Sequence, residues 1–202
     1  MTTKNKIFPL NPPKKTSKKP NKRTINPEFT TAIRAAKLIR VCAAFMAPDR
    51  QRFYRLSKFI LHQVIHADTC HPIGERQILH EHLKVFENYA FDPDHPLEKY
   101  LPADIITSVD NKISISIPQP AINWPAQSLY YKIFLLGVSI DFQAFTASSV
   151  SQSTEWLTQD TAPIHLEIDN TCSLLIAIGI AFSNNKTTVA TCKAVKIICV
   201  NT

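Results

Sequence analysis

Three residues of types that bind zinc, His62, His66 and Cys70, are spaced four residues apart. On one continuous helix this spacing places the three side chains on a common face. Zinc sites need three or four nitrogen and sulfur ligands in tetrahedral geometry. The chain has no HExxH motif, and Cys70 falls where we expect the helix to end, just before His71 and Pro72. We therefore predict surface or half-buried histidines here and no metal site.

Residues that could support hydrolysis are present, but they do not form a known motif. His165, Asp141 and Asp169 accompany many serines, yet the GxSxG motif of a nucleophile elbow is absent. The carboxylates Asp92 and Asp94 lie in a proline-containing stretch and are typical of turns. We expect no catalytic residue, no cofactor and no small-molecule substrate, and we interpret the protein as not being an enzyme.

The glycine content argues against a phosphate-binding loop. The chain has only three glycines, at positions 74, 137 and 179, so the P-loop and Rossmann motifs are absent. No apolar run approaches the roughly 18 residues needed to span a bilayer, and no apolar region follows the lysine-rich N-terminus as in a secretory signal. Five cysteines without a CxxC motif indicate reduced thiols. We expect a cytoplasmic protein that does not bind membranes.

Positive charge is concentrated at the N-terminus. The net charge is +7, and the first 26 residues contain eight basic residues and no acidic one. The remaining 176 residues carry 15 basic and 16 acidic residues, so the body is close to neutral. Prolines and lysines predict an extended arm over residues 1–26. Its expected partner-binding residues are the apolar Ile7, Phe8 and Leu10 and the basic Lys14, Lys15, Lys18, Lys19, Lys22 and Arg23.

The arm allows three interpretations. It could bind nucleic acid through counterion release, bind an acidic protein or anionic surface, or only keep the protein soluble. Arg34, Lys37 and Arg40, at three-residue steps, could extend it into a basic patch. No zinc finger, RNP motif or KH loop accompanies it. Its apolar residues could instead dock in a groove on the body or on a partner.

The first part of the body has the period of helices. Asn26 and Pro27 are suited to cap and open a helix, and Pro48 predicts a tight turn into a second helix. Apolar residues then recur at helical spacing until about Asp68, with basic residues expected on the outer face. We predict a short helix within residues 75–85, an extended segment over 86–91 and a loop over 92–96.

From about residue 103 the spacing of apolar residues changes from the 3.6-residue period of a helix to the two-residue period of a strand. Residues 113–117 and 164–169 alternate apolar and polar side chains, which predicts half-buried strands. Residues 174–182 are apolar on both faces and predict a central strand, and 130–142 predict a long strand with Gly137 as a bulge. A weaker pattern covers 148–157, and a last strand ends the chain. The sequence therefore predicts an α+β fold: an N-terminal helical hairpin followed by an antiparallel β-sandwich.

Three short motifs resemble a group of Bacteroidota proteins of similar size. They are Asn26-Pro27-Glu28-Phe29 with the basic residues before it and the following Ala35-Ala36-Lys37-Leu38, then Gly74-Glu75-Arg76 with Phe86-Glu87-Asn88, and finally Trp124-Pro125 with Tyr130 and Ile140-Asp141-Phe142. The resemblance covers most of residues 22–145, while the proline- and lysine-rich arm departs from it. The resemblance implies a helical N-terminal part and a β-rich C-terminal part. The group has no assigned activity, so the resemblance implies no catalytic residue.

These observations favour a structural or interaction protein. We expect an arm over residues 1–26, a helical region over 27–100 and a sandwich over 101–202. Residues 101–202 contain 21 Ser or Thr against only 12 charged residues. Such a surface loses little solvation on association, so we expect it to bind a protein partner or further copies of the chain through a strand edge. The alternative is a nucleic-acid-associated protein that uses the arm and the basic helical faces.

Overall fold

A computed structural model describes residues 26–43, 50–101, 106–109, 112–117, 124–161, 164–169, 173–186 and 192–201. The predicted arm and the turn predicted at Pro48 lie outside these residues. The helical elements are α1 (Pro27–Ile39), a 3₁₀ turn (Arg40–Ala43), α2 (Arg50–Phe59), a π-helical turn (Ile60–Ile65) that continues α2, and two 3₁₀ helices (His80–Phe86 and Leu97–Lys99). The described part contains no helix long and apolar enough to cross a membrane.

The predicted start of the first helix is confirmed. Asn26 caps α1 by accepting a hydrogen bond from the backbone N–H of Glu28 at 2.9 Å, and Pro27 occupies the first helical position, where no N–H is needed. The second helical segment ends at Ile65, close to the predicted end. The short helix predicted within residues 75–85 is instead a 3₁₀ helix, His80–Phe86.

Seven described strands form two antiparallel sheets. The strands are β1 (Ile106–Val109), β2 (Lys112–Ile117), β3 (Tyr130–Asp141), β4 (Thr146–Ser153), β5 (Ile164–Asp169), β6 (Leu175–Ser183) and β7 (Cys192–Val200). One sheet has the order β1-β2-β5 and the other the order β4-β3-β6-β7. The predicted α+β fold with an antiparallel sandwich is therefore confirmed.

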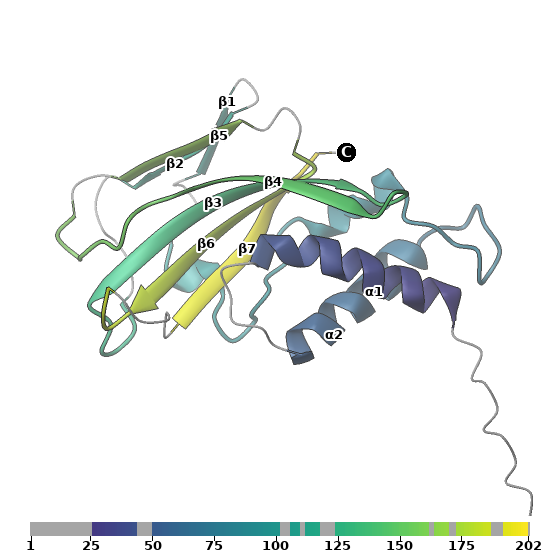
Figure 1. Cartoon of the computed structure of the whole chain (residues 1–202), viewed down its shortest axis with the longest axis horizontal. Coiled ribbons are helices and arrows are strands. Elements are labelled where there is room, and N and C mark those ends of the chain that lie inside the picture. The colour runs from purple at the N-terminus through teal and green to yellow at the C-terminus, as the bar shows by residue number, and fades with distance from the viewer. Residues whose placement is uncertain are drawn as a thin grey trace, which may run out of the picture.

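The larger sheet is the middle of three layers (Figure 1). Its β3 side chains alternate between two cores, as the two-residue period of a strand requires. Ile133 and Leu135 face the smaller sheet and pack with Ile113, Ile115 and Leu166. The alternate β3 residues face the helical layer instead. β6 is buried along its whole length, which confirms the predicted central strand.

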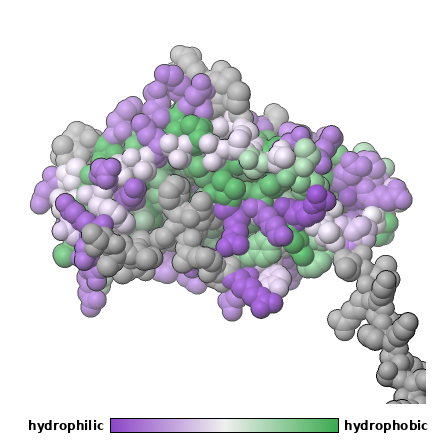
Figure 2. All heavy atoms as spheres, viewed as in Figure 1, coloured by the Kyte–Doolittle hydropathy of each residue, from purple (hydrophilic) through white to green (hydrophobic). Residues whose placement is uncertain are grey.

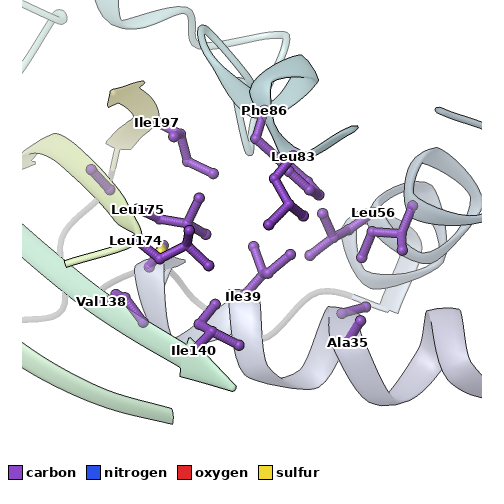
Figure 3. Close-up of a cluster of buried hydrophobic side chains, with 14 of the residues drawn as sticks. Ala35, Ile39, Leu56, Leu83, Phe86, Val138, Ile140, Leu174, Leu175 and Ile197 are labelled. Carbon is purple, nitrogen blue, oxygen red and sulfur yellow. The ribbon is translucent and has the colours of Figure 1, made fainter. Parts of the chain in front are cut away.

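The second core joins the helices to the opposite face of the large sheet. Ile39 of α1 packs with Val138 and Leu175 of the sheet and with Leu56 of α2 (Figure 3). Leu83 and Phe86 of the 3₁₀ helix close the same cluster. The helical region and the large sheet therefore share one hydrophobic core.

Gly137 is not the bulge that the sequence suggests. The pairing of β3 with β4 and with β6 runs through Gly137 without a shift, and the irregularity lies between Ile176 and Ala177 in the pairing of β6 with β7. A side chain at position 137 would overlap the Ser173 hydroxyl and press on Val150. Glycine is needed there for close packing, not for a change of register.

Candidate functional site

Strand β4 forms one edge of the large sheet and is exposed along all eight residues, Thr146–Ser153. It contains no charged residue, no proline and no glycine. Its pairing with β3 is regular from Asp141↔Thr146 to Phe134↔Ser153, so the register contains no bulge. Among the described residues, no segment pairs with its outer edge.

The other described edges are protected in ways that β4 is not. The outer edge of β7 is covered by residues 88–91: Ile197 donates its N–H to the Tyr89 carbonyl, and its own carbonyl accepts from the Asn88 N–H. β5 presents His165, Glu167 and Asp169 at alternate positions. β1 has only four residues. Short, charged or covered edges are the usual protection against strand pairing.

A side chain of β4 also connects the two sheets. The Gln152 amide oxygen accepts a hydrogen bond from the backbone N–H of Glu167 in β5. This bond occupies part of the β5 edge. Val150, two residues earlier in β4, lies opposite Gly137 and is the one large apolar side chain of β4, with 48% of its surface exposed. β4 therefore presents an apolar residue flanked by serines.

A concave region, separate from the β4 edge, lies where α1 begins. The cavity has a volume of about 420 Å³ and is bounded by the first turn of α1, by residues 74–80 and by the turn between β3 and β4. We call it the α1 pocket. Its lining residues are Pro27, Glu28, Thr31, Gly74, Glu75, Arg76, Gln77, Ile78, Leu79, His80, Phe142, Gln143 and Phe145.

Two buried carboxylates hold the walls of the α1 pocket in place. Glu28 is only 2% exposed; its Oε1 accepts from the Gly74 N–H at 2.7 Å and its Oε2 lies 3.4 Å from His66 Nε2. Asp68 accepts from the N–H groups of Gln77 at 2.8 Å and Cys70 at 2.9 Å. The hydrogen bond from Gln77 is the main cause that lowers the pKa of Asp68 to about 2. A carboxylate that accepts several backbone N–H groups fixes the loop around it.

The candidate zinc ligands are not brought together. The rings of His62 and His66 are 5.1 Å apart and meet edge to face, while His66 points to Glu28. Cys70 is exposed beyond the helix end, and its N–H donates to Asp68. In the described part of the chain, no three His, Cys, Asp or Glu residues are grouped so that they could hold a metal ion.

The residues considered for hydrolysis take structural roles. Asp141 accepts from the backbone N–H groups of Gln143 and Ala144, both at 2.8 Å, and so forms the turn after β3. His165 is exposed in β5 and pairs with Ser116, whereas Asp169, at the far end of β5, pairs with Lys112. These three residues therefore do not converge on one serine.

The possible basic patch divides between two neighbours. Arg34 lies 3.8 Å from the ring centroid of Phe145 in the turn between β3 and β4, whereas Arg40 lies 5.9 Å from the ring of Phe53 in α2. Lys37 is exposed between them in the last turn of α1. The expected arm residues, Ile7, Phe8, Leu10, Lys14, Lys15, Lys18, Lys19, Lys22 and Arg23, lie outside the described residues.

The expectation that the basic residues of α2 all lie on its outer face is wrong. Arg52 is half-buried and forms an ion pair with Asp92, which is 3% exposed and also accepts from His95. Arg55 donates to the carbonyls of Ala90 and Phe91. Both arginines thus anchor the segment that covers the edge of β7. Asp92 also accepts from the Asp94 N–H, the turn geometry predicted for this loop.

Two of the described thiols, those of Cys42 and Cys199, are wholly or partly buried. Cys42 is buried among the helices, and burial raises the pKa of its thiol to about 12. Burial also raises the pKa of Cys199. Because the thiolate is the nucleophilic form, both sites disfavour thiol chemistry. Cys172 lies outside the described residues.

Sequence reasoning missed the buried carboxylate Glu28, although a signal for it was present. Glu28 lies four, seven and eleven residues before Ala32, Ala35 and Ile39, all of which face the core. A carboxylate on the apolar face of a helix requires a partner, and that partner is the distant Gly74. Figure 2 shows hydrophobic residues across the middle of the viewed face, with hydrophilic residues among them and along its top, its base and its two ends.

Comparison with known proteins provides no family assignment: no protein-family model, no curated protein and no solved structure matches the chain.

Proposed function

We propose that this chain is a non-enzymatic interaction protein that assembles with a second copy of itself through strand β4. The observation that carries the proposal is the eight-residue edge Thr146–Ser153, which is uncharged, exposed and unpaired on its outer side within the described structure. An exposed edge of this kind is a template for another strand. A second copy supplies a strand of the same length and the same neutral character.

The pairing geometry follows from the two-fold symmetry of a dimer. An antiparallel pair of identical strands related by a two-fold axis places residues of the same sheet face opposite each other. An axis through Val150 brings the two Val150 side chains together and pairs Ser148 with Gln152 of the second copy. This register removes the exposed apolar surface of Val150 from water, which is favourable by about 25 cal/mol per Å². The neighbouring serines carry no charge to desolvate.

The basic residues of the arm add a contact with an anionic partner in this proposal. The rival function is association with nucleic acid. It is favoured by the eight basic residues of the arm together with three exposed basic residues, Arg34 and Lys37 of α1 and Arg40 directly after it. The two functions differ in their response to salt, because counterion release weakens nucleic-acid binding steeply as salt rises whereas backbone pairing and apolar burial are much less sensitive.

A charge-swap experiment tests the assembly. Val150→Lys and Val150→Glu each place two like charges opposite each other in the dimer, which is destabilising in a cross-strand pair. Light scattering after size-exclusion chromatography should give a dimer for the unmodified chain and a monomer for each variant. An equimolar mixture of the two variants should form a heterodimer, because the facing charges are then opposite.

Gln63→Lys is the matched control. Gln63 is exposed in the helical layer, so this change adds the same charge away from β4 and should leave the dimer intact. A monomeric unmodified chain, or a Val150→Lys variant that remains dimeric, contradicts the proposal. Copurification of material absorbing at 260 nm that is lost at high salt supports the nucleic-acid function instead.

A further inference from the structure

The α1 pocket has features that the pairing of β4 does not use. It combines the apolar side chains of Ile78, Phe142 and Phe145 with several polar residues in one lining. Its volume of about 420 Å³ lies within the range of ligand sites, which are concave and mostly preformed. Glu28 and Asp68 hold its walls, so little ordering is required when the pocket is filled.

Phe145 is held in an uncommon conformation at the edge of this pocket. Its φ angle is +54°, in the left-handed region that favours glycine, and an aromatic residue there is a genuine outlier. The guanidinium of Arg34 lies over one face of its ring at 3.8 Å. Such backbone outliers cluster at binding sites, where the surrounding structure maintains them. Phe145 is therefore positioned as a wall of the pocket.

The lining of the pocket suits an extended peptide. Arg76, Gln77 and His80 contribute polar side chains, and Phe142 and Phe145 contribute apolar surface. An extended peptide brings backbone carbonyls and N–H groups together with apolar side chains that can fill the space beside the two phenylalanines.

We propose that the α1 pocket binds residues 7–10 of the same chain, with Phe8 as the main apolar anchor. The arm joins the body at Asn26, next to Pro27, which itself lines the pocket. Residues 11–26 can span about 55 Å when extended, so they are long enough to return residues 7–10 to a pocket that lies beside the start of α1. This short connection gives the chain's own segment an effective concentration in the millimolar range.

Charge does not select the occupant of this pocket. Its lining contains two carboxylates, Glu28 and Glu75, against the guanidinium of Arg76 and the imidazole of His80, so it has no strong excess of either sign. The lysines of the arm therefore gain little there, whereas Ile7, Phe8 and Leu10 match its apolar wall. Prolines 9, 12 and 13 stiffen the segment and reduce the entropy lost when it docks.

Photo-crosslinking in the full chain tests this placement. Phe8 is replaced by photoreactive p-benzoylphenylalanine, the protein is irradiated, and the products are separated by mass and mapped by peptide mass spectrometry. The expected product has the mass of a single chain and links position 8 to residues 74–80 or 142–145. The same reagent at Thr16 is the positional control and should give no link to these residues.

Arm variants separate apolar docking from charge. Ile7→Ser together with Leu10→Ser should lower the yield of the cross-link by about tenfold or more, because apolar burial is lost. Lys18→Ala together with Lys19→Ala should leave the yield within about twofold, because an exposed ion pair contributes at most about 1 kcal/mol. All of these changes lie in the arm, outside the described core.

The test is independent of assembly. In a chain that also carries Val150→Lys, the same single-chain cross-link should form whether or not β4 pairs. A cross-link between two chains, a link that maps elsewhere on the body, or a yield that depends on Lys18 and Lys19 overturns the proposal. If position 8 is linked to the pocket but the unmodified chain never dimerises, the docking of the arm is supported and the proposed assembly is rejected.

Discussion

The carboxylate of Glu28 accepts a hydrogen bond from the backbone N–H of Gly74 at 2.7 Å, across 46 residues of sequence. Glu28 stands in the first turn of α1, where a negative charge is favoured by the helix dipole, yet it is 2% exposed. Its second oxygen faces His66, at the end of the helical segment that follows α2. One side chain thus joins both helical segments to the loop that lines the α1 pocket.

We expect Glu28→Ala to destabilise the protein by about 1–3 kcal/mol, because it removes the buried carboxylate that accepts from the half-buried Gly74 N–H. Glu28→Gln retains an oxygen that can accept this bond and should cost less than Glu28→Ala. Urea denaturation followed by circular dichroism measures both free energies of unfolding. Glu75→Ala, at an exposed position of the same loop, serves as the control and should stay within about 0.5 kcal/mol of the unmodified chain. Equal stability of the two Ala variants contradicts the role assigned to Glu28.

Asp68 should make the stability of the fold depend on pH. Hydrogen bonds, foremost from the backbone N–H of Gln77, lower the pKa of Asp68 in the folded state to about 2, whereas the unfolded chain has the ordinary value near 3.8. A depressed folded-state pKa contributes stability that is fully present above the unfolded value. We therefore expect this contribution to be lost as the pH falls from about 4 to about 2.

Asp68→Asn should remove this part of the pH dependence. Denaturation midpoints measured at intervals between pH 6 and pH 2 would then fall less steeply for the variant than for the unmodified chain. Asp94→Asn is the matched control, because it makes the same chemical change at an exposed position outside the loop that Asp68 holds. Parallel curves for Asp68→Asn and the unmodified chain would refute the assignment.

The elements could be predicted from the sequence because apolar periodicity reports burial directly. Residues 164–169 alternate buried and exposed side chains as the pattern indicates, and β6 is buried on both faces as its continuous apolar run indicates. The cap at Asn26 depends only on neighbouring residues, so it too was predictable. Short strand β1 lacks enough residues to show a period, and the sequence did not indicate it.

The long-range contacts of buried carboxylates could not be predicted in the same way. The partners of Glu28 and Asp92 are Gly74 and Arg52, 46 and 40 residues away, and no local pattern connects them. Arg52 also follows the spacing of the exposed basic residues of α2, so its half-buried position becomes visible only when the loop around Asp92 is in place. Tertiary pairing of charges depends on topology, which periodicity does not specify.

The last prediction concerns Gly179, where an added Cβ would approach a neighbouring side chain even more closely than at Gly137. A Cβ at position 179 would overlap the ring of Phe134, which is 1% exposed and enclosed by the core between the sheet and the helices. The ring cannot move aside without displacing its neighbours, because protein interiors are close-packed. A Cβ at position 137 would mainly meet the Ser173 hydroxyl, which can rotate about a single bond.

We therefore expect Gly179→Ala to destabilise the protein by about 1–3 kcal/mol, as overpacking does in a filled core, and Gly137→Ala to cost less. Thermal unfolding followed by circular dichroism gives the ranking directly. Phe134→Leu provides the internal check: it removes the planar ring that Gly179 accommodates, so combining it with Gly179→Ala should restore part of the loss that Gly179→Ala causes alone. The free-energy changes caused by the two substitutions should then not add, as is usual for residues in contact. Strict additivity, or a larger cost at Gly137 than at Gly179, would show that the close approach of Phe134 does not determine the residue at position 179.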